Sequence, residues 1–472
     1  MEEQVSVHID QLNPRGWGIG LHTPPPPASS GKVEVIGGLP GDTASVRLNR
    51  KRRGKWRAQL LEILQPSPLR VQPRCVHVPE CGGCTWQQMD YSAQLKEKEQ
   101  RVKQFFAPLL HDPKTIFKPI ITCDEPWRYR NKMEFSFSQN RAGERFLGLI
   151  IAGSKGHVLN LSECHLVSPW FVETLKNVRT WWEQSGLQAY RMNDTGSLRT
   201  LIIREGKRTG AKLVMLTVSG NPTYALHQSQ LKGFVEAVKS SVPESQWQNL
   251  SIFLRVQQIC KGSPTQFFEM LLSGPDHLLE KMQLVLDKPI ELAFKISPSS
   301  FFQPNTFQAE KLYSEALNMV SFPKRHVFDL YAGTATLGMA MAARAEKVTA
   351  IELNAHACCD AESNKELNQL QNLEIICGDV GKKLEELQKR SDFVHPDLIV
   401  VDPPRMGLDE TALTHLKSLS PAEILYVSCN PETQASNIQS LLQSGYRLDR
   451  VKPVDQFPHT PHIEVIALLK RL

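Results

Sequence analysis

Two strand-end motifs in the last third of the chain constrain its fold more than any other feature. The apolar run at 424–427 leads into Ser428-Cys429-Asn430-Pro431, where the proline prevents the strand from continuing. A second apolar run, at 398–401, leads likewise into Asp402-Pro403-Pro404-Arg405. Such runs are typical of parallel sheets buried on both faces, whose ligands bind at the carboxyl ends of the strands. The sequence therefore predicts an α/β fold in which one crevice holds both Cys429 and Asp402.

A cysteine after a buried strand is commonly just a small buried hydrophobe. Here Asn430 and Pro431 adjoin it, and a second strand-end motif is expected nearby. These neighbours favour a functional thiol.

A small-residue loop precedes these motifs and predicts a cofactor site. The segment 327–338 reads as a strand, a turn containing Gly333, and the start of an apolar helix, and the next strand ends in Glu352. Such a loop lets backbone approach a ligand closely, and an acid at the next strand end can hold ribose hydroxyls. A glycine turn alone also serves plain helix packing. Because Glu352, Asp379 and Asp402 all follow predicted strands, a nucleoside-bearing cofactor is the better interpretation.

NAD and S-adenosylmethionine both fit an acid that holds ribose. Ala335 stands where a dinucleotide site prefers a glycine to admit pyrophosphate, which favours a cofactor without pyrophosphate. Amino-directed nucleic-acid methyltransferases carry an aromatic residue after a comparable Asp-Pro-Pro motif. Arg405 in that place argues against an exocyclic amine as the target.

Three cysteines lie close together in the first third of the chain. Cys75, Cys81 and Cys84 are joined by a segment with two glycines, and Cys164 is a candidate fourth ligand. Thiolates so close can converge on one metal centre, and the spacing alone leaves zinc and an iron-sulfur cluster both open.

The first 70 residues predict a small β-barrel, from short apolar segments separated by glycine-rich turns, with an exposed loop at 24–27. Seven basic residues without an acid surround Trp56 there: Arg47, Arg50, Lys51, Arg52, Arg53, Lys55 and Arg57. A charge run is often only a solvated face. On a small barrel with an aromatic residue among the charges, binding to a phosphate backbone is the better interpretation. Through the stretches 16–20 (Gly-Trp-Gly-Ile-Gly) and 39–42 (Leu-Pro-Gly-Asp) and this basic turn, the segment also resembles a TRAM domain, an RNA-binding barrel attached to RNA-modifying enzymes.

At 472 residues the chain is too long for one core. We expect three domains: a barrel at 1–70, a central mixed α/β domain at 71–290 that carries the cysteines, and a cofactor-binding domain at 291–472. A helix is expected at 91–110, capped by Ser92, with Leu95, Val102 and Phe106 on its apolar stripe and lysines elsewhere. The chain has no apolar run of membrane-spanning length and no basic leader, so a cytoplasmic location is expected. Ten cysteines in that compartment favour free, metal-bound or catalytic thiols over disulfides.

Taken together, the motifs identify a family. Over nearly its full length the chain resembles the RlmD (RumA) type of 23S ribosomal RNA (uracil-5-)-methyltransferases, within the TrmA superfamily of class I enzymes. The resemblance rests on these stretches: 301–305 (Phe-Phe-Gln-Pro-Asn), 329–333, Glu352, 402–405, 428–431 and 457–464. It implies a C-terminal Rossmann-like domain and S-adenosylmethionine as cofactor. It also implies a [4Fe-4S] cluster on Cys75, Cys81, Cys84 and Cys164.

The resemblance further implies residue roles. The cofactor contacts it implies are Gln303, Tyr331, Gly333, Thr336, Glu352, Asp379 and Asp402. The sequence departs from relatives at Ala332, Ala335 and Thr336 in the cofactor loop, and at Ile150 and Ile151.

The expected chemistry is methylation of uracil C5. A thiolate of Cys429 adds to C6, C5 becomes nucleophilic and takes the methyl group of the sulfonium cofactor, and a base then removes the C5 proton so that the thiolate can leave. Glu464 is the predicted base, and Asp402 orients the uracil or the thiol. The target uridine has to be single-stranded or flipped out. The alternatives are a transfer RNA enzyme that makes the same base, and an RNA-binding assembly factor without catalysis.

Overall fold

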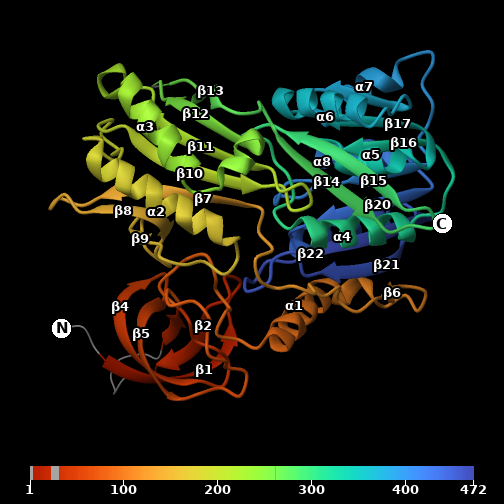
Figure 1. Ribbon diagram of the computed structural model, residues 1–472. Helices are drawn as coiled ribbons and strands as arrows, with labels where there is room; N and C mark the ends of the chain where they lie inside the picture. The colour runs from red at the N-terminus through yellow and green to blue at the C-terminus, as the bar shows by residue number, and fades with distance from the viewer. Residues whose placement is uncertain (1–3, 23–30, 261) are drawn as a thin grey trace.

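A computed structural model describes residues 4–22, 31–260 and 262–472. The loop expected at 24–27 lies outside these residues, as do the side chains of Arg50 and Arg52. In the described part, the chain forms a closed barrel, a seven-stranded sheet, an eight-stranded sheet and a two-stranded hairpin. Figure 1 shows the barrel at the lower left, the seven-stranded sheet above it and the eight-stranded sheet at the right.

The N-terminal barrel is closed in the order β1-β2-β3-β5-β4, as the sequence predicts. Its core is aliphatic and includes Val7, Ile9 and Val33, each at most 1% exposed. Gly20 permits a close strand crossing, because a Cβ there would lie 2.1 Å from the carbonyl oxygen of His8. Its strands are β1 (Gln4–Leu12), β2 (Gly18–His22), β3 (Gly31–Val35), β4 (Thr43–Arg52) and β5 (Lys55–Gln65).

The basic run predicted to bind RNA forms the β4–β5 hairpin of this barrel. Arg53 and Gly54 make its turn with φ of 49° and 76°. In the antiparallel β1–β4 pair, Gln4 lies opposite Arg47 and His8 opposite Thr43. The hairpin tip therefore lies at the opposite end of the barrel from the β1–β2 and β3–β4 loops.

The central sheet has the order β13-β12-β11-β10-β7-β8-β9 and is mixed, since β11 and β12 are parallel and other neighbours antiparallel. Helices α2 (Pro169–Gln184) and α3 (Gln228–Lys239) cover one face of this sheet (Figure 1). Apolar side chains of sheet and helices, such as Phe135, Phe171 and Phe234, form one core. The strands are β7 (Lys132–Gln139), β8 (Arg145–Ile150), β9 (Val158–Asn160), β10 (Leu198–Glu205), β11 (Lys212–Ser219), β12 (Leu250–Gln258) and β13 (Gln266–Ser273).

The C-terminal sheet has the order β18-β17-β16-β19-β20-β22-β21-β6. Strands β16 to β20 run parallel and β22 runs antiparallel to β20, so the carboxyl ends of β16, β19 and β20 lie at the same edge as the start of β22. The strands are β6 (Ile116–Phe117), β16 (Lys324–Leu330), β17 (Ala345–Glu352), β18 (Leu373–Cys377), β19 (Leu398–Val401), β20 (Glu423–Ser428), β21 (Tyr446–Val454) and β22 (Glu464–Arg471). The helices are α4 (Thr306–Met319), α5 (Thr336–Ala342), α6 (Ala355–Leu367), α7 (Val380–Gln388), α8 (Glu410–Leu419) and α9 (Pro431–Leu442).

A hairpin of β14 (Leu278–Leu284) and β15 (Ile290–Ile296) joins the central and C-terminal sheets. The domain boundary expected at 290/291 falls within this hairpin. Met282 and Phe294 are fully buried in one core with residues of α4 and α6. We therefore propose a boundary before β14 in place of the one at 290/291.

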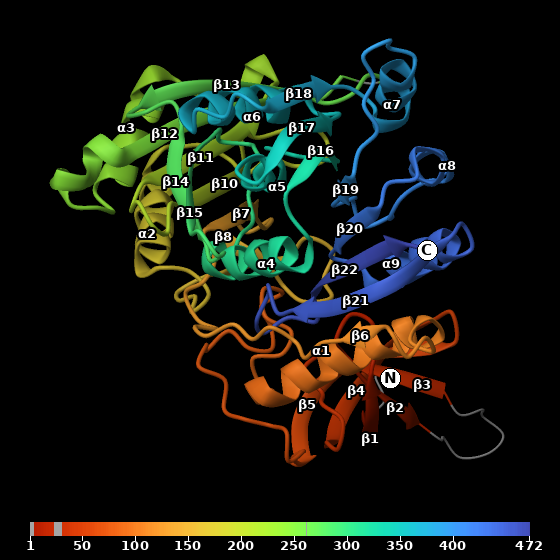
Figure 2. The same ribbon diagram turned by 90° about the vertical axis from the view of Figure 1, so that its right-hand side faces the viewer.

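Helix α1 (Tyr91–Phe106) and β6 also pack with the C-terminal sheet, far from it in sequence (Figure 2). Val102 and Phe106 are buried in the core on that side. The helix differs from its prediction: Asp90, not Ser92, accepts the cap hydrogen bonds, and the helix ends at Phe106 and continues as a short 3₁₀ turn, Ala107–Leu109. The expectation that the lysines lie away from the buried stripe is wrong for Lys98, which is fully buried.

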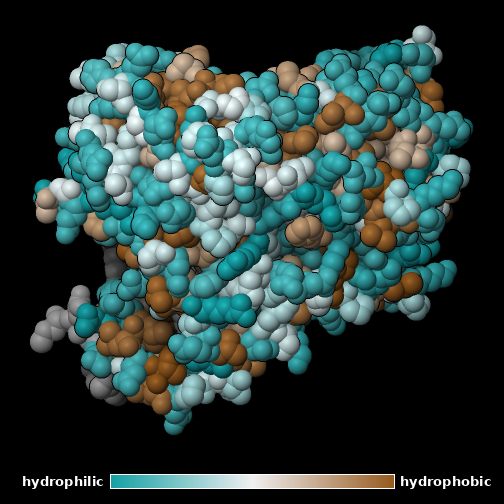
Figure 3. Space-filling view, viewed as in Figure 1, coloured by the Kyte–Doolittle hydropathy of each residue, from teal (hydrophilic) through white to brown (hydrophobic). Residues whose placement is uncertain are grey.

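The surface seen in Figure 3 is largely hydrophilic, with hydrophobic side chains gathered over the barrel and near β12 and β13. None of the helices in the described ranges is long and apolar enough to span a membrane.

Candidate active site

A cavity of about 400 Å³ lies at the edge where β16, β19 and β20 end and β22 begins. It brings together most of the residues singled out from the sequence. Its lining includes Gln303, Tyr331, Gly333, Thr336, Asp402, Cys429 and Glu464.

Cys429 follows β20 directly, as the sequence predicts. Asn430 caps α9 and Pro431 occupies its first turn, so the strand gives way at once to a helix. The side-chain amide of Asn430 donates a 2.9 Å hydrogen bond to the carbonyl oxygen of Arg405. This bond joins the two strand-end motifs and fixes Cys429 beside Asp402 in one cavity.

The environment of Cys429 contains opposing charges. Burial raises the pKa of its thiol, and the nearby carboxylates of Glu464 and Asp402 raise this pKa further. The guanidinium of Arg405 opposes both, by its charge and by a hydrogen bond to the thiol. Arg405 is therefore the group that favours the thiolate.

Three carboxyl groups face this cavity: those of Asp329 and Glu464 are buried, and that of Asp402 is half-buried. Burial raises the pKa of Asp402 to about 7. Burial also raises the pKa of Asp329 to about 7, although the Gly338 N–H donates a 2.8 Å hydrogen bond to its Oδ2. Glu464 is 5% exposed, and burial followed by the charge of Asp402 places its pKa well above the ordinary value. A cationic ligand in this cavity would be stabilised by these carboxylates and would in turn favour their ionised forms.

The small-residue loop after β16 presents its backbone to the cavity. Tyr331, Gly333 and Ala335 all have left-handed backbone, with φ of 62°, 57° and 56°. The Gly333 N–H donates a 2.8 Å hydrogen bond to Oε2 of Glu352. This hydrogen bond joins the loop to Glu352, the acid at the end of β17, and leaves the loop backbone facing the cavity.

Among the other predicted cofactor residues, Gln303 lines the cavity, whereas Asp379 and Glu352 do not. Gln303 is buried, and its backbone oxygen accepts a 2.8 Å hydrogen bond from the Asn131 side chain. Asp379 caps α7 by accepting from the Lys382 N–H at 3.1 Å, and it is not among the residues that line the cavity. Glu352 also stands behind the loop instead of in the lining.

The four cysteines of the predicted metal site line a second, small cavity together. Apolar side chains such as Leu149 and Leu161 complete its wall. Burial raises the pKa of Cys75 to about 11, and the neighbouring thiols Cys81 and Cys164 raise it further. In residues 4–22, 31–260 and 262–472, no three His, Cys, Asp or Glu side chains are disposed to hold a metal ion.

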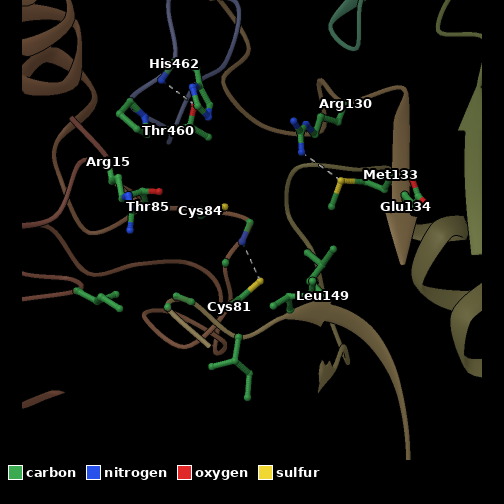
Figure 4. A pocket seen from close by; sticks show the side chains of 18 of the residues that line it. Arg15, Cys81, Cys84, Thr85, Arg130, Met133, Glu134, Leu149, Thr460 and His462 are labelled. Carbon is green, nitrogen blue, oxygen red and sulfur yellow. Dashed lines mark hydrogen bonds between the residues drawn. The ribbon is translucent and has the colours of Figure 1, made fainter. Parts of the chain in front are cut away.

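A larger cleft of about 890 Å³, shown in Figure 4, adjoins the catalytic cavity. Arg15 and Trp17 contribute from the β1–β2 loop of the barrel, and Arg130 and Lys132 from the central domain. Phe301, Phe302 and Arg405 line both this cleft and the catalytic cavity, so the two are continuous. In Figure 4, Arg15 and Thr85 lie across the cleft from Arg130, with Thr460 and His462 above.

Trp17 is flanked by cations in this cleft. The guanidinium carbons of Arg15 and Arg57 lie 5.3 and 5.5 Å from its ring centroid. A positively charged aromatic surface of this kind suits nucleic-acid backbone and bases. Of the predicted basic run, Arg57 therefore adjoins the cleft, whereas the hairpin tip does not.

The two histidines before Glu464 have different surroundings. His459 is buried and stacks on Trp127 at 3.9 Å between ring centroids, and burial lowers its pKa to about 4. His462 lies on the open side, 3.5 Å from the Arg405 guanidinium. Desolvation and that charge lower its pKa, although solvent screens part of the effect.

Asp329 and Arg405 are the site residues that the sequence interpretation left without a role. Asp329 stands on β16 just before the loop, where the argument used for Glu352 and Asp402 applies equally. Arg405 was used only to exclude a target, although its position next to Asp402 places a cation in the same crevice.

Comparisons with known proteins agree on one kind of protein. A family model described as tRNA (Uracil-5-)-methyltransferase matches residues 269–472. A protein of Protochlamydia amoebophila named as an RNA methyltransferase is 48% identical over 93% of this chain and 99% of its own length. A second, from Caldanaerobacter subterraneus, is 32% identical over 99% of both chains. The crystal structure of Pyrococcus abyssi tRNA (uracil-54, C5)-methyltransferase with S-adenosyl-L-homocysteine superposes with a TM-score of 0.72, covers 98% of this chain and 99% of that one, and is 24% identical.

Proposed function

This chain belongs to the RNA (uracil-5-)-methyltransferase family, and from that premise we propose that it methylates C5 of a uridine in 23S ribosomal RNA through a covalent adduct on Cys429. It is an S-adenosylmethionine-dependent RNA methyltransferase of the TrmA superfamily. The observation that carries the proposal is one cavity in which Cys429, Glu464 and Asp402 meet the small-residue loop, continuous with a basic and aromatic cleft.

The first step is addition of the Cys429 thiolate to C6 of the uracil ring. The new C6–S bond pushes the electrons of the C5–C6 double bond toward O4, which gives C5 the negative character it otherwise lacks. Arg405 favours the thiolate by its charge and its hydrogen bond to the sulfur.

The last step is elimination. Glu464 accepts the proton from C5, the electrons of the C–H bond restore the C5–C6 double bond, and the C6–S bond breaks to release the Cys429 thiolate. A raised carboxyl pKa makes Glu464 a stronger base than an exposed glutamate. Asp402, half-buried beside both groups, is placed to orient the uracil or the thiol.

The residues around the cavity fit the family's cofactor. When bound, S-adenosylmethionine supplies an electrophilic methyl group on a sulfonium cation. Gln303, Tyr331, Gly333, Thr336 and Asp402 would hold it, since they line the cavity, and Glu352 holds the loop open from behind. Asp379, at the next strand end, is proposed as a contact from the rim. The buried carboxylates supply the negative field that a sulfonium requires.

We also propose that Cys75, Cys81, Cys84 and Cys164 hold a [4Fe-4S] cluster. All four thiols line one enclosed cavity with apolar walls, and the Gly83 N–H lies 3.4 Å from the Cys81 sulfur, a donor suited to a thiolate ligand. The four thiols would hold the irons of the cluster, although among the described residues no three of them are disposed around a single ion. The methyl transfer above needs no electron, so the cluster is assigned a structural role.

The cluster is tested by metal analysis. Anaerobically purified protein should contain about four iron atoms per chain. Cys84→Ser should lose the iron, whereas Cys260→Ser, which changes an exposed cysteine, should keep it. Stoichiometric zinc with negligible iron would refute the cluster.

Transfer RNA is the second candidate substrate, because the family model and the archaeal enzyme are both named for it. The archaeal enzyme superposes on nearly the whole of this chain. The set of domains present therefore does not distinguish a ribosomal RNA substrate from a transfer RNA substrate. The ribosomal target is proposed from the resemblance of the motifs.

The deciding experiment maps 5-methyluridine in total RNA from a strain that lacks the gene. Loss at a 23S position that returns with the wild-type gene, but not with Cys429→Ala, supports the proposal. Loss of 5-methyluridine from transfer RNA alone would mean that transfer RNA, and not ribosomal RNA, is the substrate. A protein that retains no S-adenosylmethionine and changes no RNA modification would instead be a binding factor.

A further inference from the structure

The base Glu464 lies at the foot of a hairpin loop. Strand β21 ends at Val454 and β22 begins at Glu464, and these two residues are cross-strand partners. Residues 455–463, here called the catalytic loop, connect them. Glu464 is the residue at which this loop rejoins the sheet, and its side chain lines the catalytic cavity.

One face of helix α1 holds the catalytic loop through buried polar contacts. The Lys98 ammonium lies 2.5 Å from Oδ1 of Asp455 and 2.9 Å from the carbonyl oxygen of Phe457. The Tyr91 hydroxyl donates a 2.8 Å hydrogen bond to Oδ2 of the same carboxylate. Lys98 and Asp455 are both fully buried. Buried charges are costly unless paired, so this pair specifies one position of the loop relative to α1.

Gln94, one turn from Lys98 on the same helix face, holds the middle of the loop. Its Oε1 accepts a 2.8 Å hydrogen bond from the His459 N–H, and its Nε2 lies 3.2 Å from His459 Nδ1. The same Nε2 donates to the carbonyl oxygen of Trp86 at 3.0 Å. Gln94 therefore bridges the catalytic loop and the segment that follows Cys84.

The loop conformation is imposed from outside. His459 has φ of 65°, a left-handed backbone that is unfavourable for a residue other than glycine. Its carbonyl oxygen accepts hydrogen bonds from the N–H groups of Thr85 and Trp86, both at 3.0 Å. Backbone strain persists only where surrounding structure over-determines it, and here helix α1 and the segment 85–86 do so.

We propose that Lys98, with Tyr91 and Gln94, positions the general base Glu464, an inference that rests on the role proposed for Glu464. These three α1 residues are absent from the lining of the catalytic cavity in the part of the chain that the structure describes. They act through the catalytic loop and not on the substrate. Cys429 lies between β20 and α9, and although α9 packs against α1, the buried polar contacts of Lys98, Tyr91 and Gln94 go to the catalytic loop and not to α9.

This division predicts a selective defect. Loosening the catalytic loop displaces the base while the nucleophile keeps its place. Addition and methyl transfer then proceed, but removal of the C5 proton is slow. A general loss of folding would instead reduce every step alike.

The test uses full-length protein, methyl-labelled S-adenosylmethionine and total RNA from the deletion strain. Lys98→Met should lower kcat at least tenfold, leave the rate of the first methyl transfer within about threefold, and accumulate a methylated protein–RNA adduct that resists denaturation. Lys103→Met is the matched control, because Lys103 lies on the same helix but pairs with Glu99 at the surface. It should behave as wild type.

Lys98→Met leaves Asp455 buried without its partner and can fail to fold. The double variant Lys98→Met, Asp455→Leu removes both charges and keeps a packed interior. It should fold and still accumulate the adduct. Normal kcat in the double variant, or equal loss in all steps without adduct, would overturn the inference.

Glu464→Gln separates this inference from its premise. If Glu464→Gln accumulates adduct and the folded Lys98 variants do not, positioning by α1 is wrong and the base assignment stands. If Glu464→Gln itself gives no adduct, the base assignment fails and the inference fails with it.

Discussion

The positive charge of Arg405 lowers the pKa of the Cys429 thiol, and among the described residues that line the catalytic cavity Arg405 is the cationic one. The carboxyls of Glu464 and Asp402 act on the same thiol in the opposite sense. The ionisation of the nucleophile therefore depends on a single positive charge.

Replacing Arg405 should shift activity to higher pH. In Arg405→Met the pKa of the Cys429 thiol rises further, because the burial and carboxylate effects are no longer opposed. At pH 7.5 the rate of methyl transfer should fall severalfold or more, because a smaller fraction of the thiol is ionised. The rate should recover in part toward pH 9.5, measured in single turnovers.

The matched control for this change is Arg325→Met. Arg325 pairs with Asp397 at an exposed site at the start of β16, away from the cavity. It should leave the pH profile unchanged. An unchanged pH profile in Arg405→Met would show that Arg405 does not promote formation of the Cys429 thiolate.

Cys429 and Glu464 should fail in opposite ways, because they act at the two ends of one covalent intermediate. Cys429→Ala should give neither methyl transfer nor a covalent protein–RNA species. Glu464→Gln should transfer at most one methyl group per enzyme and hold the RNA in a denaturation-resistant adduct. Gel electrophoresis of labelled RNA under denaturing conditions measures both. Normal turnover by Glu464→Gln, or trapping by Cys429→Ala, would show that the assignment of base and nucleophile is wrong.

The β4–β5 hairpin tip should contribute affinity but not turnover. Its exposed cations lie at the end of the barrel away from the cleft mouth. Neutralising Lys51, Arg53 and Lys55 together should weaken RNA binding and reduce the salt dependence of log K by up to about two, the value for three phosphate contacts on single strands. The value of kcat at saturating RNA should not change.

A control of equal charge neutralises Lys382, Lys383 and Lys389, which lie on or next to α7. This triple variant should retain the salt dependence of the wild type. If the hairpin variant does so too, the hairpin is a solvated face.

Asp329 should make the protein less stable as pH rises. Its pKa is about 7 in the folded protein against 3.8 as reference, so between these values the folded state binds more protons than the unfolded state. Stability contributed by the protonated carboxyl is thus lost as pH rises through this window. Asp329→Asn, which keeps an acceptor for the Gly338 N–H, should gain roughly 2 to 3 kcal/mol over wild type between pH 5 and pH 8. Urea denaturation at both pH values checks this, and a constant difference would contradict it.

Strand ends and loops were predictable where periodicity and local chemistry agree. The barrel, the position of Cys429 after β20 and the meeting of Cys429 with Asp402 follow from apolar runs that stop at proline or polar motifs. The small-residue turn between β16 and α5 was predictable for the same reason, whereas its binding of a cofactor stays a prediction.

Long-range polar contacts were not predictable. Lys98 and Gln94 look like solvent-facing residues of an amphipathic helix, because the pattern does not contain their partners, such as Asp455, 357 residues away. The place of the β14–β15 hairpin was missed for a related reason: its alternating residues fit either sheet, and only packing against α4 and α6 decides. For Asp379, local capping of α7 gives the side chain a structural contact that the strand-end argument did not consider.

The docking of α1 and β6 against β21 gives the catalytic half of the molecule a late folding step. Residues 91–117 are made early, yet their apolar face is covered only when β21 and the helices beside it exist. Contacts over such sequence separations form slowly, because a long loop must close before they add stability. Until then the side chains of Val102 and Phe106 are exposed to solvent and can bind chaperones or other unfolded chains. A fragment that ends before residue 291 lacks β21, so the apolar face of residues 91–117 stays exposed in it. A truncated protein that keeps the C-terminal sheet therefore also needs residues 91–121.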